Sequence, residues 1–244
     1  MLGRRSLLAL LGAPLLPPPL LADDFPVRPI TLVVPFAAGG SIDVLARFAA
    51  QNASVRLGQP IVVDNRGGAA GLIGAAAVAK ADPDGYTLLL ASAAQVTIPP
   101  WINRSLAFDP TKDLAPVAHL ADTPMALVVA SRSTVLTVDD FVAGARANRG
   151  GLNYASTGVG TISHLVMETL KLAAGIDIVH VPYRGAAPAL NDLQAGQVQG
   201  MFTSTASALS AQISRCSQSS LASSVAALQV VPPVGSITQS VSTV

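Results

Sequence analysis

The fold of this chain is decided by the stretch Ile30-Thr31-Leu32-Val33-Val34-Pro35-Phe36-Ala37-Ala38-Gly39-Gly40-Ser41-Ile42-Asp43-Val44-Leu45-Ala46-Arg47. Its residues 31–34 form a short β-branched and apolar run, which suits a covered parallel strand. Ser41 is a good N-cap, and apolar residues then recur at helical spacing. Between strand and helix, Gly39 and Gly40 let the backbone take a positive φ and let a ligand approach the amides. Because free amides at a helix start favour an anion, this loop is either a plain turn or an anion site.

A second strand–glycine loop–helix pattern lies more than a hundred residues later. It consists of a strand over residues 152–155, the glycine-rich loop Ser156-Thr157-Gly158-Val159-Gly160-Thr161 and a helix over residues 163–174. The remaining pattern alternates strands and helices, which predicts an α/β fold with parallel sheets. Ligands bind at the carboxyl ends of such strands, so two facing lobes would place a helix start on each wall of a cleft. The other expected strands are 60–64, 87–91, 178–181 and 198–202, and the other helices are 71–80, 137–149 and 187–195.

The composition sets limits on size, charge and metal chemistry. The chain has 244 residues, enough for one large or two small domains with a real core. Lys and Arg number 15 against 14 Asp and Glu, so the charge does not suggest nucleic acid or an anionic membrane surface as a partner. Cys216 is the only cysteine, which excludes an intramolecular disulfide and a cysteine-based metal site. We expect neither a metal nor a cofactor, since no His, Asp or Glu cluster has metal-ligand spacing.

Residues 1–22 resemble an export signal. Arg4 and Arg5 form a basic start, residues 7–16 form an apolar run, and Leu20-Leu21-Ala22 provides a cleavage end. The apolar run is too short to span a bilayer. We therefore expect export, by the general secretory route or by the twin-arginine route that the paired arginines allow.

Two enzyme interpretations of the second loop compete with a binding role. The run Gly158-Val159-Gly160-Thr161-Ile162-Ser163 is one glycine short of a dinucleotide fingerprint, and Arg184 at the end of the next strand would suit a 2′-phosphate. The run Tyr154-Ala155-Ser156-Thr157-Gly158 resembles a nucleophile elbow in which Tyr154 replaces the first glycine. We favour a binding protein that is not an enzyme, with an NADP-dependent oxidoreductase as the alternative.

The ionisable residues near the two loops have simpler structural explanations. Asp43 is an acid in the first turn of a helix, where the dipole favours it. His164 lies early in a helix and His180 within a buried strand, so we expect packed or capping histidines rather than catalytic bases. With His119, these are the only histidines, and their order shows no catalytic triad.

Five motifs along the chain are specific as a set. They are Val34 to Arg47 of the first stretch, Val63-Asp64-Asn65-Arg66-Gly67-Gly68-Ala69-Ala70-Gly71-Leu72-Ile73-Gly74, Pro83-Asp84-Gly85-Tyr86-Thr87-Leu88-Leu89, Phe108-Asp109-Pro110 with Lys112-Asp113-Leu114-Ala115-Pro116-Val117, and Val181-Pro182-Tyr183-Arg184-Gly185-Ala186. Together they resemble the motifs of substrate-binding receptors of tripartite tricarboxylate transporters, also called Bug or TctC receptors, over about residues 25–213.

The resemblance implies a type II periplasmic-binding-protein-like α/β fold, with two lobes of parallel-rich sheets and a ligand cleft between them. It implies a monomeric periplasmic receptor that captures a small carboxylate and delivers it to integral-membrane transporter subunits; a sensor with the same fold stays open. Thr203 and Ser204 stand where the family often has an acid, which argues against an amino-acid ligand. The residues expected to bind the ligand are Phe36, Ala38, Gly39, Gly40, Ser41, Asp43, Ser92, Ser156, Thr157, Gly158, Gly160, Thr161 and Thr203.

We expect four segments along the chain. They are the export signal over residues 1–22, a first lobe over 23–121, a second lobe over 122–213 and a serine-rich irregular tail over 214–244. From residue 193 onward Arg215 is the only charged residue, and Pro232 and Pro233 break regular structure. The segments with which the family returns to the first lobe are missing. We interpret the tail as the product of a frameshift near codon 213, which leaves the return incomplete and would weaken or abolish carboxylate binding by this chain. A genuinely divergent short receptor is the alternative.

Overall fold

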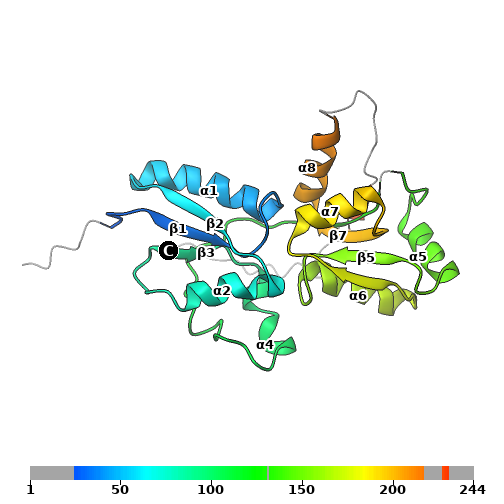
Figure 1. The fold of residues 1–244 in the computed structure, drawn as a ribbon, viewed down its shortest axis with the longest axis horizontal. Coiled ribbons are helices and arrows are strands. Elements are labelled where there is room, and N and C mark those ends of the chain that lie inside the picture. Colours follow the sequence, from blue (N-terminus) through cyan, green and yellow to red (C-terminus); the bar gives the residue numbers. More distant parts are fainter. Residues whose placement is uncertain (1–24, 131, 217–226, 231–244) are drawn as a thin grey trace, which may run out of the picture.

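The computed structural model describes residues 25–130, 132–216 and 227–230, and Figure 1 shows two lobes side by side. The expected export signal lies outside the described residues, as does most of the expected tail.

The first lobe is a three-stranded parallel sheet in the order β2–β1–β3. Its central strand β1 pairs on both sides, and its apolar side chains are buried because helices cover both faces of the sheet. Helix α1 covers one face and helix α2 the other (Figure 1). The elements are β1 (Ile30–Val34), α1 (Ser41–Leu57), β2 (Ile61–Asn65), a 3-10 turn η1 (Ala69–Gly71), α2 (Leu72–Ala79), β3 (Thr87–Leu89), α3 (Ala93–Val96) and α4 (Pro99–Ile102).

The second lobe is a five-stranded sheet in the order β6–β5–β7–β4–β8. Strand β5 pairs in parallel with β6 and β7, whereas β4 runs antiparallel to both β7 and β8. One core lies between the sheet and the helices α5 and α6, and a second core packs α7 and α8 on the opposite face. The elements are β4 (Met125–Val128), α5 (Val138–Ala147), β5 (Asn153–Ser156), α6 (Ile162–Ala174), β6 (Val179–Pro182), α7 (Ala186–Ala195), β7 (Gly200–Ser204), α8 (Thr205–Cys216) and β8 (Ala227–Val230).

The two lobes connect their strands and helices in the same order. In each, a central strand runs through a glycine loop into a helix, then to an edge strand, a second helix and the strand on the other side. The α/β fold with parallel-rich sheets expected from the sequence is therefore confirmed, and the two glycine loops occupy equivalent places.

Regular structure continues beyond residue 213, where we expected an irregular tail. Helix α8 ends at Cys216, and strand β8 extends the second sheet along β4. Strand β8 is only four residues long, which is too short to show strand periodicity in the sequence. It is recognised by its pairing with β4. Within the described part of the chain, the helices are too short or too polar to cross a membrane.

Candidate functional site

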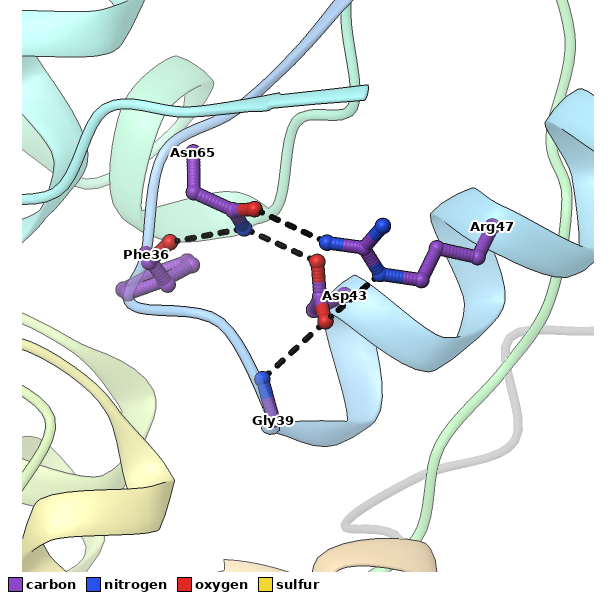
Figure 2. Close-up of polar contacts among 5 residues, drawn as sticks. All are labelled: Phe36, Gly39, Asp43, Arg47 and Asn65. Atoms are coloured by element: carbon purple, nitrogen blue, oxygen red, sulfur yellow. Dashed lines mark hydrogen bonds and ion pairs between the residues drawn. The ribbon is translucent and has the colours of Figure 1, made fainter. Parts of the chain in front are cut away.

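The loop between β1 and α1, the first glycine loop, is anchored by a buried carboxylate (Figure 2). Asp43 is 4% exposed, and its Oδ2 accepts the Gly39 N–H at 3.0 Å and Arg47 Nε at 3.1 Å. Asn65 donates to the other carboxylate oxygen at 2.9 Å and to the Phe36 carbonyl at 3.2 Å. Burial alone would raise the pKa of Asp43, but the hydrogen bonds from Arg47, Gly39 and Asn65 outweigh it and lower the pKa. This loop is therefore held by a stable anion.

The same loop also contacts the second lobe. Ser41, expected as the N-cap of α1, is instead its first helical residue, and the N-cap Gly40 has no side chain to cap with. The Ser41 hydroxyl accepts from Ser204 at 2.8 Å, and its N–H donates to the Ser207 hydroxyl at 3.1 Å. Asp43 instead accepts the N–H of Gly39, the residue before the N-cap. The expected N-cap was wrong because the helix begins at Ser41 itself, which leaves Gly40 in the N-cap position.

The loop between β5 and α6, the second glycine loop, is held by neutral hydroxyls. The Ser156 hydroxyl accepts the Gly158 N–H at 3.1 Å and lies 3.2 Å from the carbonyl of the same glycine. Thr161 donates to that carbonyl at 2.7 Å. The Thr157 N–H donates to the Ser163 hydroxyl at 3.0 Å. Most of the polar groups of this loop are thus satisfied within the lobe.

Two histidine side chains contact residues of the second glycine loop. His164 Nδ1 accepts the Gly160 N–H at 3.2 Å, and His180 Nε2 lies 2.6 Å from the Ser156 hydroxyl oxygen. The two imidazole centroids are 4.3 Å apart, and His180 also stacks on Tyr154 at 4.8 Å. The sequence expectation of capping and packed histidines is confirmed by these contacts, but β6 is a partly exposed edge strand and not the buried strand that we expected around His180.

Charged groups flank this pair on the same face of the sheet. The Tyr154 hydroxyl donates to Glu168 at 2.5 Å, and Lys171 donates to the same carboxylate oxygen at 2.8 Å. Burial, and then the neighbouring His164, lower the pKa of His180 to about 4. Burial likewise lowers the pKa of His164. Both rings are therefore uncharged at neutral pH.

A cavity of about 220 Å³ lies between the lobes. Glycine, alanine and threonine provide most of its lining residues, and among the described residues that line it Arg184 is the only charged one. Such a lining offers one cation to a ligand, which suits an anion. The lining residues are Gly68, Ala69, Ala70 and Gly71 from the first lobe and Thr157, Gly158, Val159, Pro182, Tyr183 and Arg184 from the second.

The loop over residues 68–71 was missed as a site, although it was part of a recognised motif. Gln95, fully buried, donates to the Ala70 carbonyl at 2.6 Å. The Ser92 N–H and hydroxyl both donate to the Gln95 side-chain oxygen at 2.9 Å. Ala69 and Ala70 both have positive φ, which L-residues rarely adopt, so this loop is held in an unfavourable shape next to the cavity. Gly68 and Gly71, which flank these alanines, were the sequence feature that could have indicated this loop as part of the site.

The structure divides the thirteen expected residues into four groups. Thr157 and Gly158 line the cavity. Asp43, Ser92, Ser156 and Thr161 hold loops through hydrogen bonds, while Phe36 and Thr203 are buried. The remaining residues belong to the two glycine loops and to the first residue of α1; they are Ala38, Gly39, Gly40, Ser41 and Gly160. The first of these loops meets the second lobe where the Ala37 N–H donates to the Arg184 carbonyl at 3.1 Å.

The contacts of the second loop bear on the two enzyme interpretations. The Ser156–His180 contact resembles a nucleophile–base pair, but Ser156 is 0% exposed and a substrate does not reach it. A dinucleotide pyrophosphate needs free loop amides, whereas the amides of Gly158 and Gly160 already donate to Ser156 and His164. Within the described residues, no group of three or more His, Cys, Asp or Glu could hold a metal ion.

Comparison with known proteins gives consistent matches. The family model described as "Tripartite tricarboxylate transporter family receptor" matches residues 45–229, past the point near 213 where we expected the resemblance to stop. A UPF0065 protein from the tcbD-tcbE intergenic region of Pseudomonas sp. (strain P51) is 42% identical over 185 residues, which cover 76% of this chain and 55% of that protein.

Two solved structures are also similar. The periplasmic binding protein BugD is 35% identical with a TM-score of 0.74, over 78% of this chain and 63% of that one. MatC from Rhodopseudomonas palustris, solved with bound malate, is 34% identical with a TM-score of 0.72, over 79% of this chain and 65% of that one. The chain thus spans less than two thirds of the length of these proteins.

Proposed function

We propose, from the premise that this chain belongs to the tripartite tricarboxylate transporter family of receptors, that it captures a small carboxylate between its two lobes. Its family and its solved neighbours are binding proteins rather than enzymes, and they share its α/β fold. MatC holds malate, a small dicarboxylate. The proposal therefore takes the class of ligand from the relatives and its place from the cavity of this chain.

The observation that carries the proposal is the interlobe cavity with a single cation. Arg184 is one of the residues that line the cavity and the other lining residues are uncharged, so an anion bound there would make a charge-assisted hydrogen bond if the Arg184 guanidinium turns toward it. The volume of about 220 Å³ lies below the usual range of roughly 300–1,000 Å³ for ligand pockets, which favours a small solute.

We propose roles for the expected residues on this basis. Thr157 and Gly158 would contact the ligand directly, together with Arg184 and the loop over residues 68–71. The first glycine loop would contribute to the wall beside Arg184 through the Ala37–Arg184 contact, and Ser92 would act through Gln95. Binding would draw the lobes together around the solute.

The cellular setting is also proposed. The family description names a transporter, and BugD is described as a periplasmic binding protein. We propose that this chain likewise acts in the periplasm, after export by the signal expected at residues 1–22, and hands its solute to the membrane subunits of such a transporter.

Titration calorimetry of the 244-residue chain with malate tests the proposal. We expect binding of malate, with a comparison series of citrate, lactate and an uncharged polyol to define the carboxylate requirement. Arg184→Gln should weaken malate binding by about 10–100-fold, since a hydrogen bond to a charged group contributes about 1.5–3 kcal/mol.

Arg149→Gln is the matched control, because Arg149 is an exposed arginine of the same lobe that does not line the cavity. Its affinity should equal that of the unmodified chain. Binding of NADPH without binding of any carboxylate would contradict the proposal and restore the oxidoreductase alternative.

A further inference from the structure

We propose that His164 and His180 are the positioning residues of the second glycine loop, and that the loop keeps its ligand-binding shape only while both rings are uncharged. The inference rests on the proposed function, because Thr157 and Gly158 of this loop line the cavity. Neither histidine lines the cavity itself, so any effect on binding would act through the loop.

His164 contributes an acceptor that only the neutral ring possesses. Its Nδ1 accepts the Gly160 N–H at 3.2 Å, so Nδ1 must carry a lone pair. A proton at Nδ1 would turn the acceptor into a donor that faces another donor. His164 is also the third residue of α6, where the positive end of the helix dipole disfavours a cation. The hydrogen bond and the dipole therefore both require the neutral ring.

His180 acts on the other glycine of the loop through a serine. It lies 2.6 Å from the Ser156 hydroxyl, which in turn contacts both the N–H and the carbonyl of Gly158. Because Ser156 is completely buried, water does not replace a lost partner without opening the loop. The imidazole centroids lie only 4.3 Å apart, so a charge on either ring opposes a charge on the other.

The surrounding groups do not offset such a charge. Among the described residues, the titratable groups linked by contacts to this pair are Glu168 and Lys171 of α6 and Tyr154 of β5. Glu168 would attract a proton, but Lys171 at 2.8 Å already balances its charge. Burial lowers the pKa of both histidines.

The other elements packed around the two histidines place few charged groups near them. Strand β7 contributes Gly, Met, Phe, Thr and Ser, and Arg146 of α5 reaches only the far end of α6, at the Ala174 carbonyl. Asp192 of α7 bonds Tyr183, and α7 covers the opposite face of the sheet.

The first test is the pH profile of malate affinity, measured by calorimetry from pH 7.5 to pH 4.5 on the whole chain. Below the pKa of the histidine that protonates first, the dissociation constant should rise by about tenfold for each pH unit. His164→Asn supplies an amide oxygen that accepts from Gly160 and does not titrate, so it should bind malate at pH 7.5 and show a flatter profile. His164→Phe lacks the acceptor and should bind weakly at every pH.

His119→Asn is the control, because His119 is an exposed histidine outside both glycine loops, paired with Asp122. It should keep the profile of the unmodified chain, including any part caused by protonation of malate itself. Identical profiles for the unmodified chain and His164→Asn would overturn the inference. So would unweakened malate binding by His164→Phe at pH 7.5.

A second measurement needs no ligand, and it separates failure of this inference from failure of the proposed function. The Gly160 amide of the unliganded chain is followed by NMR-detected hydrogen exchange as the pH falls, with rates corrected for intrinsic pH dependence. Its protection should fall with acidification in the unmodified chain and persist in His164→Asn. Equal protection in both chains at every pH would overturn the inference even if no carboxylate binds at all.

Discussion

The two glycine loops occupy equivalent places in the two lobes but are held by opposite chemistry. In each, the third residue of the following helix accepts the N–H of the residue four positions earlier: Asp43 from Gly39, and His164 from Gly160. Asp43 is an anion with a lowered pKa, whereas His164 is a neutral base with a lowered pKa. The fold therefore sets which residue accepts the loop N–H, namely the third residue of the helix. The type of that residue decides the pH range in which it accepts this hydrogen bond.

The largest effect is expected from removing the charge in the first lobe. Asp43→Asn places an amide among the donors Gly39, Arg47 and Asn65, and one of them loses its acceptor. We expect the free energy of unfolding to fall by about 2–3 kcal/mol, as measured by urea denaturation. Asp139→Asn is the matched control, because Asp139 is an exposed acid in the first turn of α5, and its effect should stay within about 0.5 kcal/mol. Equal effects of the two variants would remove the special role of Asp43.

A backbone change in the second lobe should mainly affect binding. Gly158 has a φ of +133°, and a Cβ there would lie 3.2 Å from the Ala70 Cα across the cavity. Gly158→Ala should therefore strain the loop by about 1–3 kcal/mol and weaken malate binding by about 10–100-fold in calorimetry.

Gly175→Ala is the control for positive φ, since Gly175 ends α6 with a φ of +61° and open space around it. It should cost about 1 kcal/mol of stability and leave the malate affinity unchanged. Unchanged affinity in Gly158→Ala would place the ligand away from this loop.

The smallest effect is the response of stability to acid. The pKa of His180 is about 4, below its usual value of 6.5, so the unfolded chain binds the proton more tightly. The stability linked to His180 is fully present above pH 6.5 and is lost as the pH falls toward 4. Asp43, whose pKa is lowered from 3.8, loses its contribution only at still lower pH.

We expect roughly 1 kcal/mol less stability at pH 5 than at pH 7.5, from urea denaturation at the two pH values. His180→Gln should reduce that difference, whereas His119→Gln should preserve it. A larger acid response in His180→Gln than in the unmodified chain would contradict the assignment.

The sequence predicted those features that depend on local pattern. Alternating strands and helices predicted the α/β fold, and two glycine loops marked the equivalent strand ends. Asp43 was recognised as a first-turn acid, and His164 and His180 as capping and packed residues.

Other features depend on contacts between distant segments, and local pattern did not reveal them. Gln95 holds the Ala70 carbonyl from a helix 25 residues further along the chain. The cavity exists only because residues 68–71 and Arg184 meet across the two lobes. Strand β8 is defined by its pairing with β4 rather than by its own short sequence.

The central claim is that a small carboxylate binds between the lobes, and a crystal structure of the chain with malate tests it most directly. We predict a malate carboxylate in the cavity, within hydrogen-bonding distance of the Arg184 guanidinium and of the loops that carry Ala70 and Gly158. Malate bound only elsewhere, or a cavity that stays empty at saturating malate, would contradict the account.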